Sequence, residues 1–259
     1  MTMEVQHISQ TVQGNSVLHD ISLQFEDGRF YGIIGPNGVG KSTLLHILAG
    51  TDAPSKGTIL LDGKGLNDIP RKSLARRMAV LQQGGLPPVG FSVREVVGMG
   101  RYPYQNWLGG EDADVETIID EALAVMGLNE LQHRKLHQLS GGERQRVALA
   151  KLMVQKPDIL LLDEPTTYLD IGFQIGLLDT VRKWQREQGL LVIAVLHDLN
   201  LAALYCDEII AMHRGKVAAT GTPDNVLIPN IIDDIYSTKT IAIKHPITGV
   251  PQLILQPEI

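Results

Sequence analysis

A glycine-rich string, Gly35-Pro-Asn-Gly-Val-Gly-Lys-Ser-Thr43, constrains the fold of this 259-residue chain more than any other feature of its sequence. The string follows an apolar run at residues 30–34 and precedes a helical pattern over residues 41–49. A pattern GxxxxGK[ST] between a strand and a helix is typical of a loop that binds phosphate. Its glycines let backbone N–H groups turn inward around an anion, and the helix start adds partial positive charge. The string therefore predicts a strand–loop–helix unit with a triphosphate site.

Every residue of this string is a candidate nucleotide-binding residue. The residues are Gly35, Pro36, Asn37, Gly38, Val39, Gly40, Lys41, Ser42 and Thr43. The Lys41 ammonium can reach the β- and γ-phosphates, and the Ser42 hydroxyl can ligate Mg²⁺. The alternative is a glycine-rich turn capped by Ser42, but this alternative leaves the fit of the pattern and of both flanking elements to chance.

Three later runs are apolar almost throughout and predict buried strands, at residues 78–81, 159–162 and 190–196. Helical patterns separate them. Continuous Val, Ile and Leu suit strands that are covered on both faces, so we expect an α/β fold with a parallel-sheet core.

Alternating polar and apolar residues predict further strands near the start of the chain, at residues 3–8, 21–25 and 57–61. Asp27-Gly28 predicts a hairpin turn between residues 21–25 and 30–34, and Asp62-Gly63 follows the strand at 57–61 in the same way.

The stretch from residue 84 to 156 differs from the rest because it is mostly helical in pattern and has no convincing strand. We therefore predict a single domain whose core, residues 1–83 and 157–259, carries an inserted helical subdomain at 84–156. The last 40 residues predict a short helix at 230–236 and then a strand-rich tail.

Composition excludes several classes of protein. The chain has 23 Lys and Arg against 29 Asp and Glu, a net charge of −6, so we expect no nucleic-acid partner. One cysteine, Cys206, allows no internal disulfide, and we expect it to be a small buried side chain. The sequence starts without a signal-like pattern and has no apolar run of 18 residues, so we expect a chain that is neither secreted nor membrane-spanning.

Two carboxylates follow the apolar run at residues 159–162. Asp163 and Glu164 would lie at the carboxyl end of a buried strand, where open α/β sheets bind ligands. We predict that Asp163 holds Mg²⁺ and that Glu164 polarises an attacking water. The alternative is an acidic exit from a strand, which is common on any surface.

The string Leu139-Ser-Gly-Gly-Glu-Arg-Gln-Arg146 predicts a second anion site. Ser140 and Glu143 have the spacing of a capping box, so a plain helix start is the alternative. Gly141 and Gly142 argue against it, because glycine in a helix costs about 1 kcal/mol each, whereas bare backbone suits close approach of an anion. One chain would then hold two cradles for one triphosphate, and a dimer in which each copy completes the other's site explains both.

These motifs together resemble the ATP-binding subunits of ABC transporters. The resemblance rests on the glycine-rich loop, on Leu139-Ser-Gly-Gly-Glu143, on Leu160-Leu-Leu-Asp-Glu-Pro165, on Leu169-Asp170 and on His197. It implies a P-loop NTPase fold of the ABC ATPase type, with a parallel-sheet core, an antiparallel β-subdomain and an inserted helical subdomain. It also implies a head-to-tail homodimer that closes on two ATP, with Mg²⁺.

The resemblance assigns further roles by position. Gln83 resembles the glutamine that senses the γ-phosphate and Mg²⁺, although the adjacent Gln82 is an alternative. Asp170 resembles the aspartate that couples the two sites, and His197 the histidine that contacts the γ-phosphate. The family usually stacks adenine on an aromatic residue where this chain has Val12, so we expect weaker base discrimination.

Two strings narrow the resemblance to one class of transporter. Gly100-Arg-Tyr-Pro103 and Asp163-Glu-Pro-Thr-Thr-Tyr-Leu-Asp-Ile171 resemble ATPases of bacterial importers for iron–siderophores, haem and vitamin B12. We favour iron–siderophore as cargo. The resemblance implies membrane permease subunits as partners, a substrate-binding protein as an indirect one, and a peripheral place on the cytoplasmic face of the inner membrane.

An apolar stretch between Gly84 and Trp107, which includes Phe91, is predicted to form a groove for a short helix of the membrane subunit. The alternative is packing inside the helical subdomain. Two other functions stay open: a soluble ABC-type ATPase without transport, and an unrelated phosphate-loop kinase or GTPase. The second of these leaves residues 139–146 unexplained.

Overall fold

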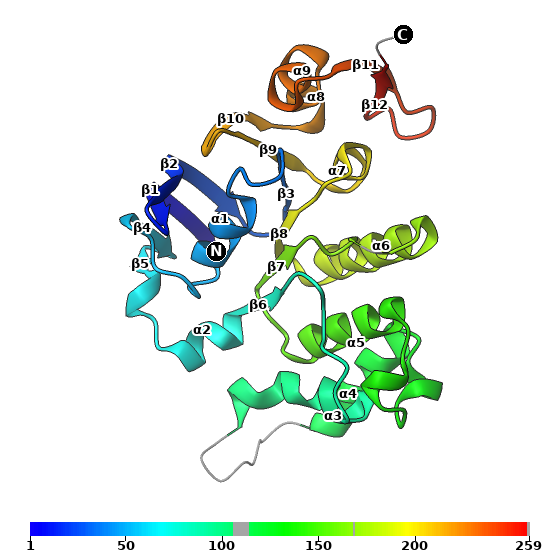
Figure 1. Cartoon of the computed structure of the whole chain (residues 1–259). Coiled ribbons are helices and arrows are strands. Elements are labelled where there is room, and N and C mark those ends of the chain that lie inside the picture. Colours follow the sequence, from blue (N-terminus) through cyan, green and yellow to red (C-terminus); the bar gives the residue numbers. More distant parts are fainter. Residues whose placement is uncertain (106–113, 168, 258–259) are drawn as a thin grey trace. The chain divides into compact units, whose positions relative to one another are not determined.

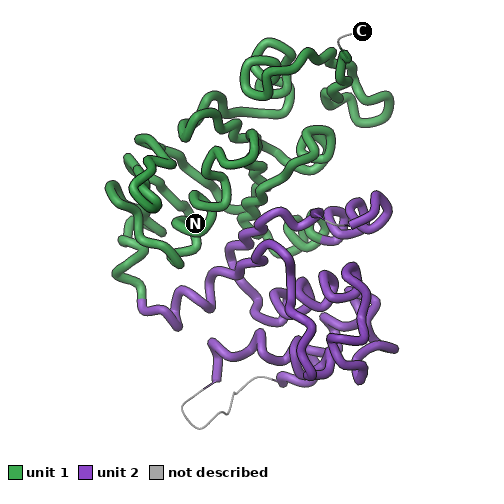
Figure 2. Tube along the Cα trace, in the orientation of Figure 1, with its two compact units in different colours: residues 1–69, 181–259 green, residues 70–180 purple. Residues whose placement is uncertain are grey.

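A computed structural model describes residues 1–105, 114–167 and 169–257 of the chain; Trp107 and Tyr168 lie outside these ranges. The chain forms two compact units (Figures 1 and 2). Unit 1 contains Met1–Ile69 and Val181–Ile259, and unit 2 contains Pro70–Thr180. Each unit is described by itself below.

An antiparallel sheet begins unit 1, in the strand order β2–β1–β4–β5. Its strands are β1 (Thr2–Val12), β2 (Asn15–Glu26), β4 (Lys56–Leu61) and β5 (Lys64–Gly65). The turn between β1 and β2 has positive φ angles of 50° at Gln13 and 82° at Gly14, as tight hairpins require. The predicted hairpin at residues 62–63 is confirmed, because β4 pairs with β5.

A second sheet region of unit 1 has the order β10–β9–β3–β8. Its strands are β3 (Phe30–Ile34), β8 (Leu191–Val195), β9 (Glu208–His213) and β10 (Lys216–Gly221). β3 pairs in parallel with both β8 and β9, and all five of its residues are buried. A strand with both faces covered needs apolar residues at every position, which explains the continuous runs in the sequence.

The predicted hairpin between residues 21–25 and 30–34 is wrong. β2 pairs with β1, whereas β3 pairs with β8 and β9, so Asp27-Gly28 turns the chain from one sheet to another. The connection before β8 holds this turn, since the Gly28 N–H donates to the Gly189 carbonyl at 3.1 Å. The physical reason is burial: β3 is covered on both faces, while β2 alternates between buried and exposed residues.

Helices and a terminal hairpin complete unit 1. They are α1 (Lys41–Leu48), α7 (Leu199–Tyr205), α8 (Pro223–Val226), α9 (Pro229–Tyr236), β11 (Lys239–Lys244) and β12 (Pro251–Gln256). Asn200 of α7 exchanges two hydrogen bonds with the backbone of Leu253 in β12, at 3.3 and 2.7 Å, and thus fixes the tail hairpin. The predicted helix and strand-rich tail are confirmed.

Unit 2 combines one pair of parallel strands with helices. β6 (Met78–Leu81) pairs with β7 (Ile159–Asp163). The helices are α2 (Arg71–Arg77), α3 (Val93–Gly98), α4 (Val115–Val125), α5 (Gly141–Val154) and the first part of α6 (Ile171–Gln188). In the described part of residues 84–156 the only strand-like feature is an isolated bridge between Ser92 and Lys135.

The predicted helical subdomain, residues 84–156, lies within unit 2, which also contains the β6–β7 pair. As a division of the chain into core and insertion, it stays a prediction.

Gly32, in the middle of β3, tests the packing of this central strand. A Cβ atom added to Gly32 would lie 2.7 Å from the Cys206 Sγ, and Cys206 is buried as predicted. We expect Gly32→Ala to lower the free energy of unfolding by about 1–3 kcal/mol, because overpacked cores must shift. Urea unfolding measures this loss.

The double variant Gly32→Ala with Cys206→Ala removes the clashing sulfur and should recover most of the loss, since residues in contact are energetically coupled. If the two single losses simply add, the proposed contact is not the cause.

Candidate functional site

The glycine-rich loop joins β3 to α1 in unit 1, as its pattern predicts. Gly38 has a φ of 77° and Gly40 a φ of 102°, a region that favours glycine. At Gly35, φ is 148° and an added Cβ would lie 2.5 Å from the Met212 carbonyl oxygen. Among the described residues, no side chain caps the start of α1 at Gly40, and a helix start of this kind is where an anion is favoured.

The loop folds around the side chain of Lys41, which is only 5% exposed. Its Nζ donates hydrogen bonds to the carbonyl oxygens of Gly35 at 2.8 Å and Pro36 at 3.0 Å. An ammonium out of water needs such partners, because burying an unpaired charge is costly. The loop thus holds a positive charge at its own centre, where the phosphates of a nucleotide would meet it.

The remaining loop residues differ in exposure. Asn37 and Gly38 are exposed, Val39 and Gly40 are buried, and Ser42 and Thr43 are half-buried in the first turn of α1.

His197 belongs to the same edge of unit 1 as the glycine-rich loop. His197 follows β8, in which Val195 is paired with Ile33 of β3. The His197 side chain is exposed. The parallel register therefore brings His197 and the loop to the carboxyl ends of neighbouring strands.

Unit 2 brings Gln83 and Glu164 together. β6 and β7 are paired at Leu81 and Leu162, so both residues lie just beyond the ends of these parallel strands. The Gln83 Nε2 donates to the Glu164 Oε2 at 2.6 Å, and Thr167 Oγ1 donates to the same oxygen at 3.3 Å. This contact favours Gln83 over Gln82 as the residue at the site.

The backbone at Glu164 has a φ of 49°, which is unusual for a residue with a side chain. Such conformations concentrate at functional sites, where the surrounding structure holds them. The preceding residue, Asp163, is the last residue of β7 and is only 2% exposed. The two adjacent carboxylates therefore have different surroundings, since Glu164 is half-buried.

The second candidate cradle begins α5. The Glu143 carboxylate accepts from the Ser140 backbone N–H at 2.7 Å and from its hydroxyl at 2.8 Å, while Ser140 Oγ accepts from the Glu143 N–H at 3.3 Å. These hydrogen bonds, the backbone one foremost, hold the pKa of Glu143 below its ordinary value. The predicted capping box is therefore present, and it satisfies the N–H groups of Ser140 and Glu143.

Packing requires neither of the two glycines at this helix start. An added Cβ at Gly142 would contact the ring of Phe173 at 3.5 Å, but one at Gly141 would have no described atom within 4 Å. Ser140 and Gly141 are also exposed. Bare, exposed backbone at a helix start matches the predicted approach of an anion.

Asp170 lies at the start of α6, where its Oδ1 accepts from the Phe173 N–H at 3.0 Å. The side chain is exposed, so a helix-capping role is established by geometry and a coupling role stays a prediction.

Sequence reasoning missed the side chains that hold the loop between β7 and α6. Gln145 Nε2 donates to the Pro165 carbonyl at 3.0 Å. Gln174 Nε2 donates to the carbonyls of Thr166 at 3.3 Å and Leu169 at 2.9 Å. The only signal in the sequence is a glutamine near the start of each helix, which does not reveal its partner.

Tyr236, at the end of α9, was also missed. Burial raises its pKa to about 12, so the hydroxyl stays neutral, and a hydrogen bond with the Gly35 backbone opposes this rise. Sequence distance hides this contact between the tail of unit 1 and the first residue of the loop.

Val12 stands where the resemblance places an aromatic residue that stacks on adenine. This residue is the last of β1, and its side chain is 40% exposed. The expected weakening of base discrimination stays a prediction.

Comparison with known proteins gives one family. The model of the ABC transporter family matches residues 18–167. The petrobactin import ATP-binding protein FpuD of Bacillus anthracis is 38% identical over 97% of this chain and 92% of its own length. The hemin import ATP-binding protein HmuV of Pseudomonas aeruginosa is 40% identical over 97% of this chain and 99% of its own length.

A further relative is longer. The uncharacterized ABC transporter ATP-binding protein YvrA of Bacillus subtilis is 40% identical over 99% of this chain, which spans 58% of YvrA.

Solved structures agree on the fold. An inward-facing putative metal-chelate type ABC transporter matches with a TM-score of 0.85, covering 99% of this chain and 98% of its own, at 21% identity. The dimeric structure of MJ0796, a bacterial ABC transporter cassette, matches with a TM-score of 0.75 at 27% identity, covering 85% of this chain and 98% of its own. The predicted fold class is confirmed.

Two capping boxes of the same construction in unit 2 allow a matched test. Ser92 and Glu95 begin α3 with the same hydrogen bonds as Ser140 and Glu143, at 2.6 Å from the Ser92 N–H and 3.3 Å from the Glu95 N–H. We expect Ser92→Ala and Ser140→Ala each to lower the free energy of unfolding by about 1 kcal/mol. Only Ser140→Ala should also lower the rate of nucleotide hydrolysis.

Thermal unfolding and a phosphate-release assay measure the two effects. Equal hydrolysis rates in both variants would reduce Ser140 to a helix cap.

Proposed function

Because the chain belongs to the ABC transporter family of ATP-binding proteins, as its motifs predicted, we propose that it is the ATP-hydrolysing subunit of an importer. The chain binds ATP, and hydrolysis drives uptake of an iron–siderophore or similar metal chelate through a membrane permease. The names of the relatives FpuD and HmuV support this class of cargo, and the alternative cargo is haem or vitamin B12.

The observation that carries the catalytic part of the proposal is the contact between Gln83 and Glu164. The Glu164 carboxylate accepts a hydrogen bond from the Gln83 amide at 2.6 Å and another from the Thr167 hydroxyl. These two hydrogen bonds define the direction of its remaining lone pairs. Such a group can align and polarise a water for attack on the γ-phosphate. Lys41 and the loop N–H groups stabilise the charge on the phosphates, and His197 contacts the γ-phosphate.

The chemistry of the available donors fits Mg²⁺. Ser42, Asp163 and Gln83 would hold the ion through hydroxyl, carboxylate and amide oxygens, the ligands that this hard cation prefers. The described residues contain no group of three His, Cys, Asp or Glu side chains able to hold a metal. We propose that the phosphates of the nucleotide supply further ligands. When bound, the ion neutralises charge on the β- and γ-phosphates.

A second copy of the chain is proposed to complete each site. Ser140, Gly141 and Gly142 of one copy would face the γ-phosphate held by the loop of the other, and Asp170 would couple the two sites. The cassette MJ0796, which is 27% identical to this chain, supports this arrangement, because its structure is dimeric. The exposed backbone at Gly141 supports it too, since nothing described in unit 2 fills that space.

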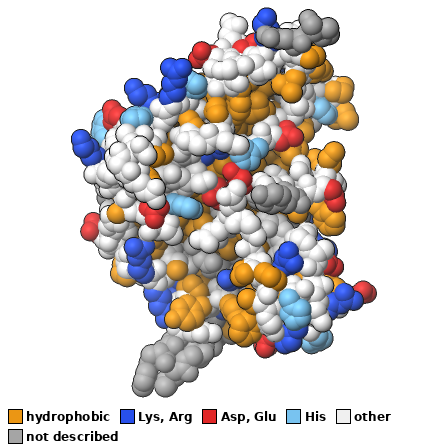
Figure 3. All heavy atoms as spheres, viewed as in Figure 1, with side chains coloured by type: hydrophobic (Ala, Val, Ile, Leu, Met, Phe, Trp, Pro, Cys, Tyr) orange, Lys and Arg blue, Asp and Glu red, His pale blue; other side chains and the backbone are white. Residues whose placement is uncertain are grey.

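The surface of unit 2 supports a place for the permease. Phe91, Met99 and Tyr102 are 51%, 42% and 75% exposed, an unusual density of large apolar side chains within 12 residues of sequence. Figure 3 shows hydrophobic side chains (orange) at the surface in the lower part of the view. A short permease helix would bury them; Trp107, the predicted end of this groove, lies outside the described residues.

The described residues include no helix that is both long and apolar enough to cross a bilayer. Separately, because the relatives FpuD and HmuV are named as import ATP-binding proteins, we propose that the permease subunits hold this chain at the cytoplasmic face of the inner membrane. A substrate-binding protein would act on it only indirectly.

Replacing the proposed catalytic carboxylate tests the function directly. Glu164→Gln should lower the ATPase rate by about 100-fold or more while ATP still binds, because the amide cannot act as a base. The variant should accumulate as an ATP-bound dimer, which size-exclusion chromatography with ATP and Mg²⁺ detects.

Glu130→Gln makes the same change on an exposed residue of unit 2 and is the control. A parent-like rate in Glu164→Gln would remove that residue from its role. Full-speed hydrolysis by a strict monomer would remove the shared-site arrangement.

Phe91→Ala tests the permease surface separately from hydrolysis. We expect about tenfold weaker binding to membranes that contain the cognate permease, with the ATPase rate of the isolated chain unchanged. Ile247→Ala is the matched control, because Ile247 is 89% exposed in the tail hairpin and lies outside the proposed surface. Unchanged permease binding and transport in Phe91→Ala would contradict the groove.

A further inference from the structure

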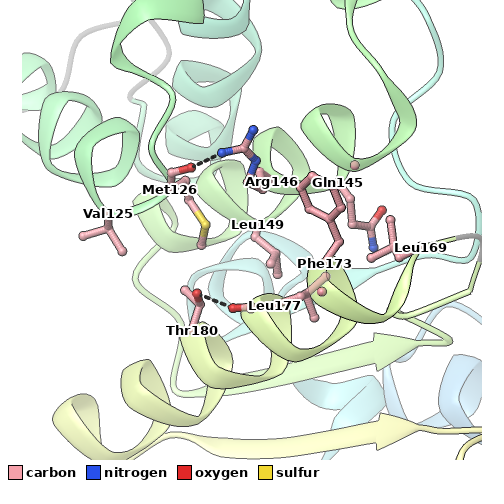
Figure 4. Close-up of a pocket in the computed structure, with 12 residues that line it drawn as sticks. Val125, Met126, Gln145, Arg146, Leu149, Leu169, Phe173, Leu177 and Thr180 are labelled. Carbon is pink, nitrogen blue, oxygen red and sulfur yellow. Dashed lines mark hydrogen bonds between the residues drawn. The ribbon is translucent and has the colours of Figure 1, made fainter.

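Gln145, in the second turn of α5, contacts both loops that carry the proposed catalytic pair, Gln83 and Glu164. Its Nε2 donates to the Pro165 carbonyl at 3.0 Å, so it holds the residue that follows Glu164. Figure 4 shows the Gln145 side chain extending from α5 toward Leu169, in the same loop. The side chain is half-buried, and all of these residues belong to unit 2.

The amide oxygen of Gln145 lies against Gly85 in the other loop. A Cβ atom added to Gly85 would lie 2.7 Å from the Gln145 Oε1, closer than real Cβ atoms approach other side chains. Gly85 closes a tight turn around Gln83, since its N–H donates to the Gln82 carbonyl at 3.2 Å. One side-chain amide therefore touches both loops, with its nitrogen on one and its oxygen on the other.

These contacts form a ring with the hydrogen bond of the catalytic pair. The Gln83 amide donates to Glu164, whose peptide bond leads to Pro165. The Pro165 carbonyl accepts from Gln145, which touches the turn around Gln83. The two loops thus meet twice, once through the catalytic pair and once through Gln145, so a shift of either loop disturbs both contacts.

The backbone of Glu164 gives such a link a purpose. Its φ of 49° lies in the left-handed region, which is unfavourable for a residue with a side chain. A conformation of this kind persists only where the surrounding structure holds it. On one side, β7 ends at Asp163 and is paired with β6. On the other side, Gln145 holds the Pro165 carbonyl.

We propose that Gln145 is a positioning residue for ATP hydrolysis, which keeps the Glu164 carboxylate aligned by holding Pro165 and the turn around Gln83. The inference rests on the proposed function, in which Glu164 polarises the attacking water. α5 also begins with the proposed cradle at residues 140–142. Gln145 therefore ties the alignment of Glu164 to the helix that would meet the nucleotide of the second copy.

Gln145→Met tests this role, because methionine has nearly the same length and no hydrogen-bond donor. We expect kcat for ATP hydrolysis to fall about tenfold, since small misplacements of a reacting group are costly. The KM for ATP should change less than about twofold, because the glycine-rich loop proposed to bind ATP belongs to unit 1. A steady-state phosphate-release assay measures both values.

Gln155→Met is the matched control at the other end of α5. The Gln155 Nε2 donates to the carbonyls of Ala75 at 2.6 Å and Met78 at 2.7 Å, so this variant loses hydrogen bonds of the same chemistry. It should lower the midpoint of thermal unfolding, as Gln145→Met does, but leave kcat at the parent value. An equal loss of kcat in both variants would reduce Gln145 to a stabilising contact.

Gly85→Ala tests the link from the other loop. Its Cβ would push the Gln145 amide aside, so kcat should again fall about tenfold. Gly84→Ala introduces similar backbone strain, because Gly84 has a φ of 83° and Gly85 a φ of 65°, but its Cβ would have no described atom within 4 Å. Gly84→Ala should therefore keep a much higher kcat than Gly85→Ala. Equal rates in the two glycine variants would contradict the role of the contact with Gln145.

Glu164→Gln separates this inference from the proposed function. If that variant hydrolyses ATP at the parent rate, the proposed function fails and this inference fails with it. If it is slow while Gln145→Met keeps the parent kcat, only the positioning role fails. Adding Gln145→Met to Glu164→Gln should lower the rate no further, because residues that act as a unit are not additive. A further loss in the double variant would show that Gln145 does not act through Glu164, and would overturn the proposal.

Discussion

The parallel pairing of β3 with strands on both sides is the interaction on which the nucleotide site depends. β3 is buried throughout and ends at Ile34. Its pairing with β8 and β9 therefore fixes the position and direction of the backbone at Gly35, the first residue of the loop. The same pairing places the end of β8, and with it His197, beside the loop. Hydrogen bonds between neighbouring strands thus set the positions of residues that are more than 150 apart in sequence.

Charge is arranged so that the site is ready for an anion before one arrives. The Lys41 ammonium is buried, and its hydrogen bonds to two carbonyl oxygens replace part of its hydration. A phosphate brought into the loop therefore meets a preorganised cation and helix start. In unit 2 the proposed catalytic group is negative instead, and Gln83 and Thr167 orient the Glu164 carboxylate by hydrogen bonds from uncharged donors.

The sequence predicted what local chemistry decides. The loop glycines, the capping box at Ser140 and the buried strands depend on near neighbours, and the structure contains all of them. The Asp27-Gly28 hairpin failed because strand pairing is chosen by burial across the whole sheet. The roles of Gln145 and Gln174 were not visible, since their partners are backbone carbonyls that only the folded chain brings near.

The two capping boxes of unit 2 separate what a helix start needs from what a ligand needs. Ser92 and Ser140 satisfy their helices in the same way, yet only the second is followed by two glycines. An added Cβ at Gly142 would make only an ordinary van der Waals contact with Phe173, so packing does not require glycine there. One at Gly141 would have no described atom within 4 Å, and the exposed backbone there costs helix stability of about 1 kcal/mol. A cost with no return inside the described part of the unit is what we expect where the proposed nucleotide of a second copy approaches the backbone.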